Sequence, residues 1–263
     1  MNIKQLLFIA VVAGAAAACS HNIDSGETAQ VLYVNGPETK VQLDSKMHSV
    51  WNDSDKVSVF YRSAVNECWV YDGEPGASEG RLKFFGERKE TGGDILALYP
   101  FASSVSLSGS VITTEIPSAQ AFADGSFGID AAVMAAKAEG QTLQFHYVCA
   151  FVSFECPVEG EIIGAVLSAD GGEAVCGSLN VDLSGNTPVP SFSGSGSTVT
   201  ISPAEGQVIP NDGKLVFSIA PGTYKMGFRI TLNMADGSQK VFRDTQTVTI
   251  PAGHIKPYKF KAI

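Results

Sequence analysis

The four histidines are the first candidates for catalysis or metal binding in this chain of 263 residues. None of them forms an HExxH pattern or another spacing that would bring two imidazoles onto one metal ion. His146 opens an apolar run, so we expect a satisfied core residue there, while His254 follows Gly253 in a predicted turn. The set therefore favours no active site; its members are His21, His48, His146 and His254.

Two other patterns resemble chemical motifs but lack an essential position. The Gly-Ser-Gly-Ser run at 194–197 has the wrong spacing for the GxSxG turn that carries a serine nucleophile, and we interpret it as a flexible loop. Asp53 and Asp55 are spaced as in a calcium loop, but the position that requires Glu is Ala64. We expect both aspartates in a turn between strands. The sequence thus predicts no enzyme, no cofactor and no metal site.

Cys19 has the clearest chemical role. Lys4 precedes an apolar run from Leu6 to Val12, and a series of small residues then ends at Ala18, directly before the cysteine. This order is typical of a signal peptide, and small residues before a cysteine resemble the lipobox of a bacterial lipoprotein. Cleavage between Ala18 and Cys19 would leave a lipid on the cysteine sulfur, and two or more acyl chains anchor a protein stably. The alternative is an ordinary secretory signal cut after one of the alanines.

The remaining four cysteines carry no metal or redox motif, because no CxxC occurs. Export would permit disulfides, but four cysteines allow three connectivities and the sequence does not select one. We expect buried free thiols, and a bridge between Cys149 and Cys156 is disfavoured because their side chains would face opposite sides of a strand. The four residues are Cys68, Cys149, Cys156 and Cys176.

Composition excludes several classes of protein. The chain is 44% hydrophobic, which is enough to form a core and argues against a disordered or fibrous protein. It has 18 Lys and Arg against 27 Asp and Glu, a formal charge of −9, so it lacks the basic field that collects phosphates. No nucleic-acid partner is expected.

Short apolar runs broken by Gly, Asn, Asp, Ser and Pro predict an all-β protein. Apolar and polar residues alternate from Tyr224 to Met234, and Asp236-Gly237 supplies the turn of a hairpin. A second turn of this kind is expected at Asp170–Glu173, and the segment from Ile129 to Glu139 is predicted as either a helix or a linker. Further strands are expected at 31–34, 39–43, 57–61, 68–71, 82–85, 95–98, 111–116, 162–167, 178–183, 198–201 and 214–219.

A change in pattern near Glu139-Gly140 predicts a domain boundary. A loop-like stretch from Ile116 to Gly125 precedes it, and a long apolar run opens a new series of strands after it. Each half is large enough for its own core. We therefore divide the chain into a signal peptide at 1–18, a tether at 19–27, an N-terminal β-sandwich at 28–139 and a C-terminal β-sandwich at 140–263.

The order of several short motifs resembles the fimbrillin family, the pilins of type V pili from anaerobic Gram-negative bacteria. Family members usually have Gly-Asp where this chain has Ser54-Asp55. The resemblance covers nearly all of the mature chain, including the lipobox and the hairpin at Asp236-Gly237. The matching segments are Thr39–Val41, Val50–Phe60, Leu98–Phe101, Ile116–Gln120, Leu143–His146 and Thr249–Gly253.

The resemblance implies two tandem transthyretin-like (Greek-key) β-sandwich domains and export as an outer-membrane lipoprotein. In many members, a protease removes the first strand and a strand from the next subunit fills the groove. Here the strand removed would be Val31 to Leu43. No Arg precedes Arg62, which argues against an Arg-specific protease, and among Lys40, Lys46 and Lys56 the best-placed cleavage site is Lys46. The roles of stalk, tip, anchor and accessory subunit stay open, as does whether the last strand, from Ile255, is donated or kept.

The partners that this implies are other fimbrial subunits, the outer membrane through the lipid, and surface ligands of host or bacterial cells. The alternative function is that of a glycan-binding surface lipoprotein with two sandwiches. Such a protein needs exposed aromatic side chains as platforms. Trp51 and Trp69 are the two tryptophans, and their places in a motif and in an alternating strand predict packing roles instead.

Overall fold

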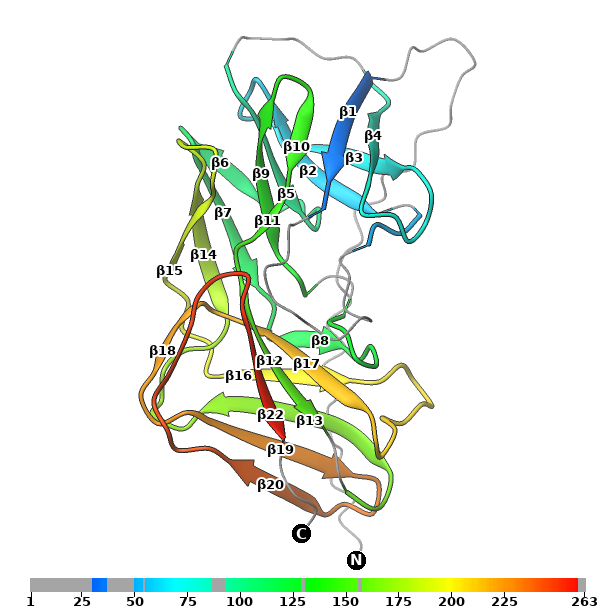
Figure 1. Ribbon diagram of the computed structural model, residues 1–263, viewed down its shortest axis with the longest axis vertical. Helices are drawn as coiled ribbons and strands as arrows, with labels where there is room; N and C mark the ends of the chain where they lie inside the picture. The colour runs from blue at the N-terminus through cyan, green and yellow to red at the C-terminus, as the bar shows by residue number, and fades with distance from the viewer. Residues whose placement is uncertain are drawn as a thin grey trace, which may run out of the picture.

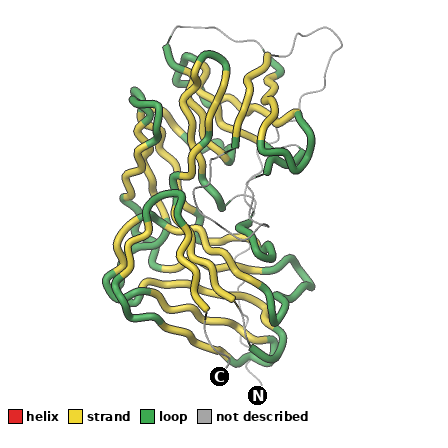
Figure 2. The backbone as a smooth tube through the Cα atoms, viewed as in Figure 1, coloured by secondary structure: helices red, strands yellow, loops and turns green. Residues whose placement is uncertain are grey.

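The structure is a computed structural model that describes residues 30–36, 50–53, 55–86, 93–128, 131–155 and 158–259. Within these ranges every regular element is a strand (Figure 2), which confirms the predicted all-β class. None of the described segments forms a helix long and apolar enough to cross a membrane.

An eight-stranded sheet occupies the upper part of the molecule (Figure 1), in the order β10-β1-β4-β3-β2-β5-β9-β11. The sheet closes on itself, because its end strand β10 pairs with β9 as well as with β1. The strands β2 and β5 lie in its middle and are buried along almost their whole length. The bounds are β1 Gln30–Asn35, β2 Lys56–Tyr61, β3 Glu67–Asp72, β4 Glu79–Phe84, β5 Ile95–Tyr99, β9 Met134–Glu139, β10 Thr142–Gln144 and β11 His146–Tyr147.

The lower part is a sandwich of a three-stranded sheet, β17-β12-β22, and a five-stranded sheet, β20-β19-β13-β16-β8. Aromatic contacts join its layers: Phe154 on β12 packs against Phe242 on β20, with ring centroids 5.0 Å apart. The bounds are β8 Ala119–Ala121, β12 Ala150–Glu155, β13 Ile162–Ala169, β16 Thr198–Ser202, β17 Lys214–Ile219, β19 Phe228–Met234, β20 Gln239–Arg243 and β22 Ile255–Lys259.

Two further sheets complete the fold. The order β15-β14-β7-β6 forms a four-stranded sheet beside the other two parts (Figure 1), and β18 pairs with β21. One continuous cluster of buried apolar residues runs through all of these sheets. The bounds are β6 Ser106–Ser108, β7 Val111–Ile116, β14 Gly177–Asp182, β15 Val189–Phe192, β18 Gly222–Tyr224 and β21 Val248–Ile250.

The strand predicted from Tyr224 to Met234 is interrupted at Gly227. Its φ angle is 61°, and a Cβ at this position would lie 2.2 Å from the carbonyl oxygen of Asp244. Glycine is the residue that tolerates both conditions. The chain therefore breaks into β18 and β19, after which the predicted hairpin through Asp236-Gly237 forms as β19 and β20.

Three local predictions are wrong. The helix considered for 129–139 is absent, because Met134–Glu139 forms β9 and pairs with β5; residues 129–130 lie outside the described part. Ala135 and Ala136 are fully buried there, since small side chains fit a crowded sheet and helix propensity is a weak preference that packing overrides. The loop predicted from Ile116 contains β8, and the turn after β13 leads into another sheet rather than into a hairpin.

The division into two domains remains a prediction. The chain passes from the eight-stranded sheet to the three-stranded sheet between β11 and β12. On the near side, β10 and β11 belong to the sheet of β1 and β5, and on the far side β12 pairs with β17 and β22. Strands from both predicted halves also share a sheet, since β7 pairs with β14. Any separation of the two units would therefore have to break these pairings.

The cysteines differ from one another. Cys149 and Cys176 are free and buried, as predicted, while Cys68 is disulfide-bonded, which corrects the expectation for that residue. Cys156 lies outside the described residues. Burial raises the pKa of the Cys149 thiol to about 11, so at pH 8 the protonated, unreactive form dominates.

We therefore expect a thiol reagent at pH 8 to leave Cys149 and Cys176 unmodified in the native chain and to modify both in denaturant. Peptide mapping by mass spectrometry assigns the modified positions, and a Cys149→Ser variant identifies the signal of that residue. Fast modification of Cys149 under native conditions would contradict its burial.

Candidate functional site around the first strand

The strand β1 is held between two partners that lie far apart in the sequence. It runs antiparallel to β4 along its whole length, with Gln30 opposite Phe84 and Asn35 opposite Glu79. On its other side it runs parallel to β10, where Tyr33 pairs with Thr142. The insertion is visible in Figure 1, where β1 stands between these two strands. Removing β1 would thus uncover two strand edges at once.

Side chains on β1 alternate between the core and solvent. Leu32 and Val34 are fully buried, while Tyr33 between them is 53% exposed. The end of the strand is also fixed, because Phe145 N–H donates to the carbonyl of Asn35 at 3.1 Å and the Gln144 amide donates to the carbonyl of Gly36 at 2.7 Å. The first strand therefore contributes two core side chains and a full hydrogen-bond ladder.

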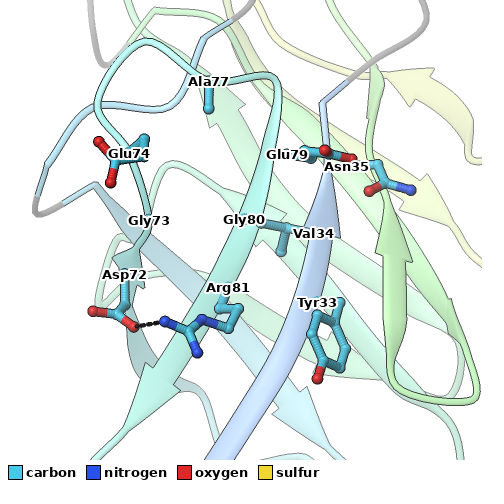
Figure 3. A pocket seen from close by; sticks show the side chains of 10 residues that line it. All are labelled: Tyr33, Val34, Asn35, Asp72, Gly73, Glu74, Ala77, Glu79, Gly80 and Arg81. Atoms are coloured by element: carbon cyan, nitrogen blue, oxygen red, sulfur yellow. Dashed lines mark hydrogen bonds and ion pairs between the residues drawn. The ribbon is translucent and has the colours of Figure 1, made fainter.

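A cleft of about 420 Å³ lies beside the end of β1 (Figure 3). One wall is formed by Tyr33 and Asn35, and the other by Glu79, Arg81 and the loop after β3. That loop is tied down by Tyr71, whose hydroxyl donates to the carbonyls of Glu74 and Glu79 at 3.2 and 3.0 Å.

The charges in this cleft are partly paired. Asp72 forms ion pairs with Arg81 at 3.0 Å and with Lys83 at 2.8 Å. The hydrogen bond from Lys83, with the charge of Arg81, holds the pKa of the Asp72 carboxyl below its ordinary value. Within the described part of the chain, no side chain pairs with the carboxylates of Glu74 and Glu79. The cleft therefore carries a net negative charge.

The motif that begins at Val50 forms an aromatic cluster behind β1. Trp51 stacks on Tyr71 with centroids 5.5 Å apart and meets Phe145, from the run after β10, edge to face at 5.4 Å. Asp55 is buried, and its carboxylate accepts the N–H of Asn52 at 2.8 Å, so the predicted turn is confirmed. Trp51 and Trp69 are 3% and 0% exposed, which confirms their packing roles.

Gln120, in the segment Ile116–Gln120, has a function that sequence reasoning missed. Its side chain is 6% exposed, and its amide bonds both backbone groups of Ser218: Nε2 donates to the carbonyl at 2.8 Å, and Oε1 accepts the N–H at 3.0 Å. At the other end of β17, the carboxylate of Asp124 accepts the N–H of Lys214. The segment from 120 to 124 thus covers the outer edge of β17. The sequence feature that could have indicated this role is the single Gln at the end of the segment Ile116–Gln120.

The last described strand pairs with a strand of the same chain in this structure. β22 runs parallel to β12, with Phe151 opposite Ile255 and Glu155 opposite Lys259. It forms the edge of the three-stranded sheet, and the side chains of Glu155 and Lys259 form an ion pair at 3.0 Å.

The predicted site residues lie outside the described part of the chain, namely Ala18, Cys19 and Lys46. The described histidines do not converge: His146 is half-buried on β11, and the ring of His254 contacts the carbonyl of Ala252 in a turn. Within the described ranges, no group of three His, Cys, Asp or Glu side chains is arranged to hold a metal ion.

Comparison with solved structures bears on the fold. A "putative cell adhesion protein" from Bacteroides ovatus superposes with a TM-score of 0.51 at 14% identity, covering 86% of this chain and 88% of its own. One from Bacteroides uniformis gives 0.51 at 12% identity, covering 89% and 92%. The chain shares their fold. A fimbrial protein from Bacteroides ovatus is more distant, with a TM-score of 0.40 at 13% identity, covering 90% of this chain and 50% of its own. No protein-family model matches the sequence, and no curated protein matches it.

Proposed function

We propose that this chain is a non-enzymatic structural or adhesive subunit of a cell-surface fimbria that assembles by β-strand addition. The observation that carries the proposal is the position of β1 between β4 and β10, with two side chains in the core. If β1 were removed, the groove between β4 and β10 would offer a strand from another subunit backbone hydrogen bonds on both sides. It would also offer two pockets for alternate side chains. The fold shared with the two cell adhesion proteins is consistent with this role.

The proposal includes a lipid anchor at Cys19 and signal cleavage after Ala18, followed by maturation at Lys46 in cells that carry a suitable protease. Lys46 follows β1 in the sequence and precedes β2, so a cut there would separate β1 from the rest of the chain. Other fimbrial subunits are the proposed partners, and the outer surface of the outer membrane is the proposed location.

Several sheet edges are blocked, which supports strand addition at the groove of β1. An exposed edge invites pairing with any other chain, and natural proteins block most of their edges. Here Gln120 and Asp124 cover β17, and Pro190 lies in the edge strand β15. The groove of β1 would then be the place where a foreign strand enters after cleavage.

Two experiments test the proposal. The purified chain is treated with protease and viewed by electron microscopy. A stalk subunit should form fibres or short oligomers, whereas an anchor or tip subunit should form only a dimer with an added stalk subunit. Mass spectrometry of cell-derived protein should find diacylated Cys19 at the N-terminus before maturation. A cleaved chain that neither assembles nor takes up a strand would contradict the proposal, and a Lys46→Ala variant separates this site from other cuts.

A further inference from the structure

We infer that the cleft beside β1 is a binding site for a short, neutral saccharide. It is lined by residues of three neighbouring strands, β1, β4 and β3, and of the loop between β3 and β4. This role is independent of strand addition, because it concerns the chain with β1 in place.

Strand register sets the pattern of side chains on this face. Tyr33 lies between Thr142 on β10 and Arg81 on β4, and Asn35, two residues on, lies between Gln144 and Glu79. Residues two apart on a strand face the same side and are separated by roughly 7 Å. An aromatic ring is thus bordered by a second row of amide and carboxylate groups, as Figure 3 shows for Tyr33, Asn35, Glu79 and Arg81.

This combination suits a sugar ring. The flat face of Tyr33 offers an apolar surface to the C–H groups of a pyranose, while carboxylate and amide groups exchange hydrogen bonds with its hydroxyls. Within the described residues, the side chains of Tyr33, Asn35, Glu74 and Glu79 have no hydrogen-bond partner, so their capacity is available. The volume of about 420 Å³ falls in the range of roughly 300–1,000 Å³ that is usual for small-molecule sites.

The walls of the cleft are held in place before any ligand arrives. Tyr71 is 2% exposed and fixes both ends of the loop between β3 and β4 through its hydroxyl. Gly73 and Gly80 leave room for its ring, because a Cβ at either position would lie 2.4 or 2.5 Å from ring or hydroxyl atoms of Tyr71. A preformed site loses less entropy on binding than a loop that must order.

Charge selects among saccharides. Arg81 and Lys83 are engaged with Asp72, whereas Glu74 and Glu79 keep their negative charges facing the cleft. A carboxylated sugar such as sialic acid would be repelled by these glutamates, and a neutral one would not. The site is therefore assigned to neutral saccharides.

The test is saturation-transfer NMR and calorimetry on the intact chain with maltotriose, cellotriose, mannotriose, chitotriose and lactose, with 3′-sialyllactose and a lysine-rich peptide as comparisons. At least one neutral sugar should bind with a dissociation constant below about 1 mM. Tyr33→Ala should weaken binding at least tenfold, Tyr33→Phe should change it less than threefold, and Val189→Ala, at another exposed apolar residue, should not change it.

Three results would overturn the assignment: no binding of any neutral sugar, equal binding by Tyr33→Ala, or preference for the sialylated sugar or the peptide. Because Tyr33 is exposed, unfolding curves should coincide for all variants, which separates loss of the site from loss of the fold. One consequence rests on the proposed function: a chain that has lost β1 should lose the sugar and regain it when a β1 peptide is added. If the intact chain binds sugar and the chain without β1 does not, but the β1 peptide fails to restore binding, strand replacement is contradicted and the saccharide site is not; if the chain without β1 still binds sugar, the site itself is contradicted.

Discussion

A chain that lacks residues 1–36 should lose most of its free energy of unfolding and recover it when a peptide of residues 30–36 is supplied. Burial of Leu32 and Val34 contributes about 1.5–3 kcal/mol each, and a domain is stable by about 5–15 kcal/mol in total. The ladders to β4 and β10 add to this loss because their edges become exposed. Urea unfolding of the intact chain, the shortened chain and the shortened chain with peptide measures the effect.

The peptide itself offers matched controls. A peptide with Leu32→Asp and Val34→Asp should not restore stability, because both positions enter the core, whereas one with Tyr33→Ala should restore it. If the shortened chain does not fold alone, the same contrast is available in the intact chain. There Leu32→Ala should cost about 2–5 kcal/mol, and Tyr33→Ala should cost little. Equal stability with and without β1 would contradict an inserted strand and the assembly mechanism that depends on it.

Gln120→Ala should destabilise the chain by about 2–5 kcal/mol, since each buried polar group left without a partner costs about 1–3 kcal/mol. The substitution orphans the N–H and the carbonyl of Ser218, which is fully buried. It should also promote self-association, because it uncovers the edge of β17. Chemical unfolding and size-exclusion chromatography measure the two effects.

Gln239→Ala is the matched control for this prediction. Gln239 is exposed on β20 and bonds the side chain of Asn233 at 2.9 Å, so its loss should change stability by less than about 0.5 kcal/mol. If Gln120→Ala behaved like Gln239→Ala, water would be satisfying Ser218 and the edge of β17 would not depend on the glutamine.

The sequence predicted the strands well, because alternation of apolar and polar residues is a local pattern with a period of two. β2, β7 and β17 lie within a residue of their predicted bounds, and the hairpin at Asp236-Gly237 forms as expected. The prediction was wrong for β9, where the helix preference of alanine conflicts with burial between β5 and β11. Gly227 divided a long predicted strand because of a backbone contact that no pattern in the sequence reveals.

Composition and the pattern of short apolar runs by themselves determined that the chain is an acidic β-rich protein, and the residues around Cys19 predict an exported lipoprotein. The sequence also located the first strand. The tertiary structure decided which strands pair with the first strand. It also placed Tyr33 next to Arg81 on the same face of the sheet. The reason is that pairing between β1, β4 and β10 joins residues up to about 110 positions apart. Such contacts depend on burial of the whole core rather than on any local period.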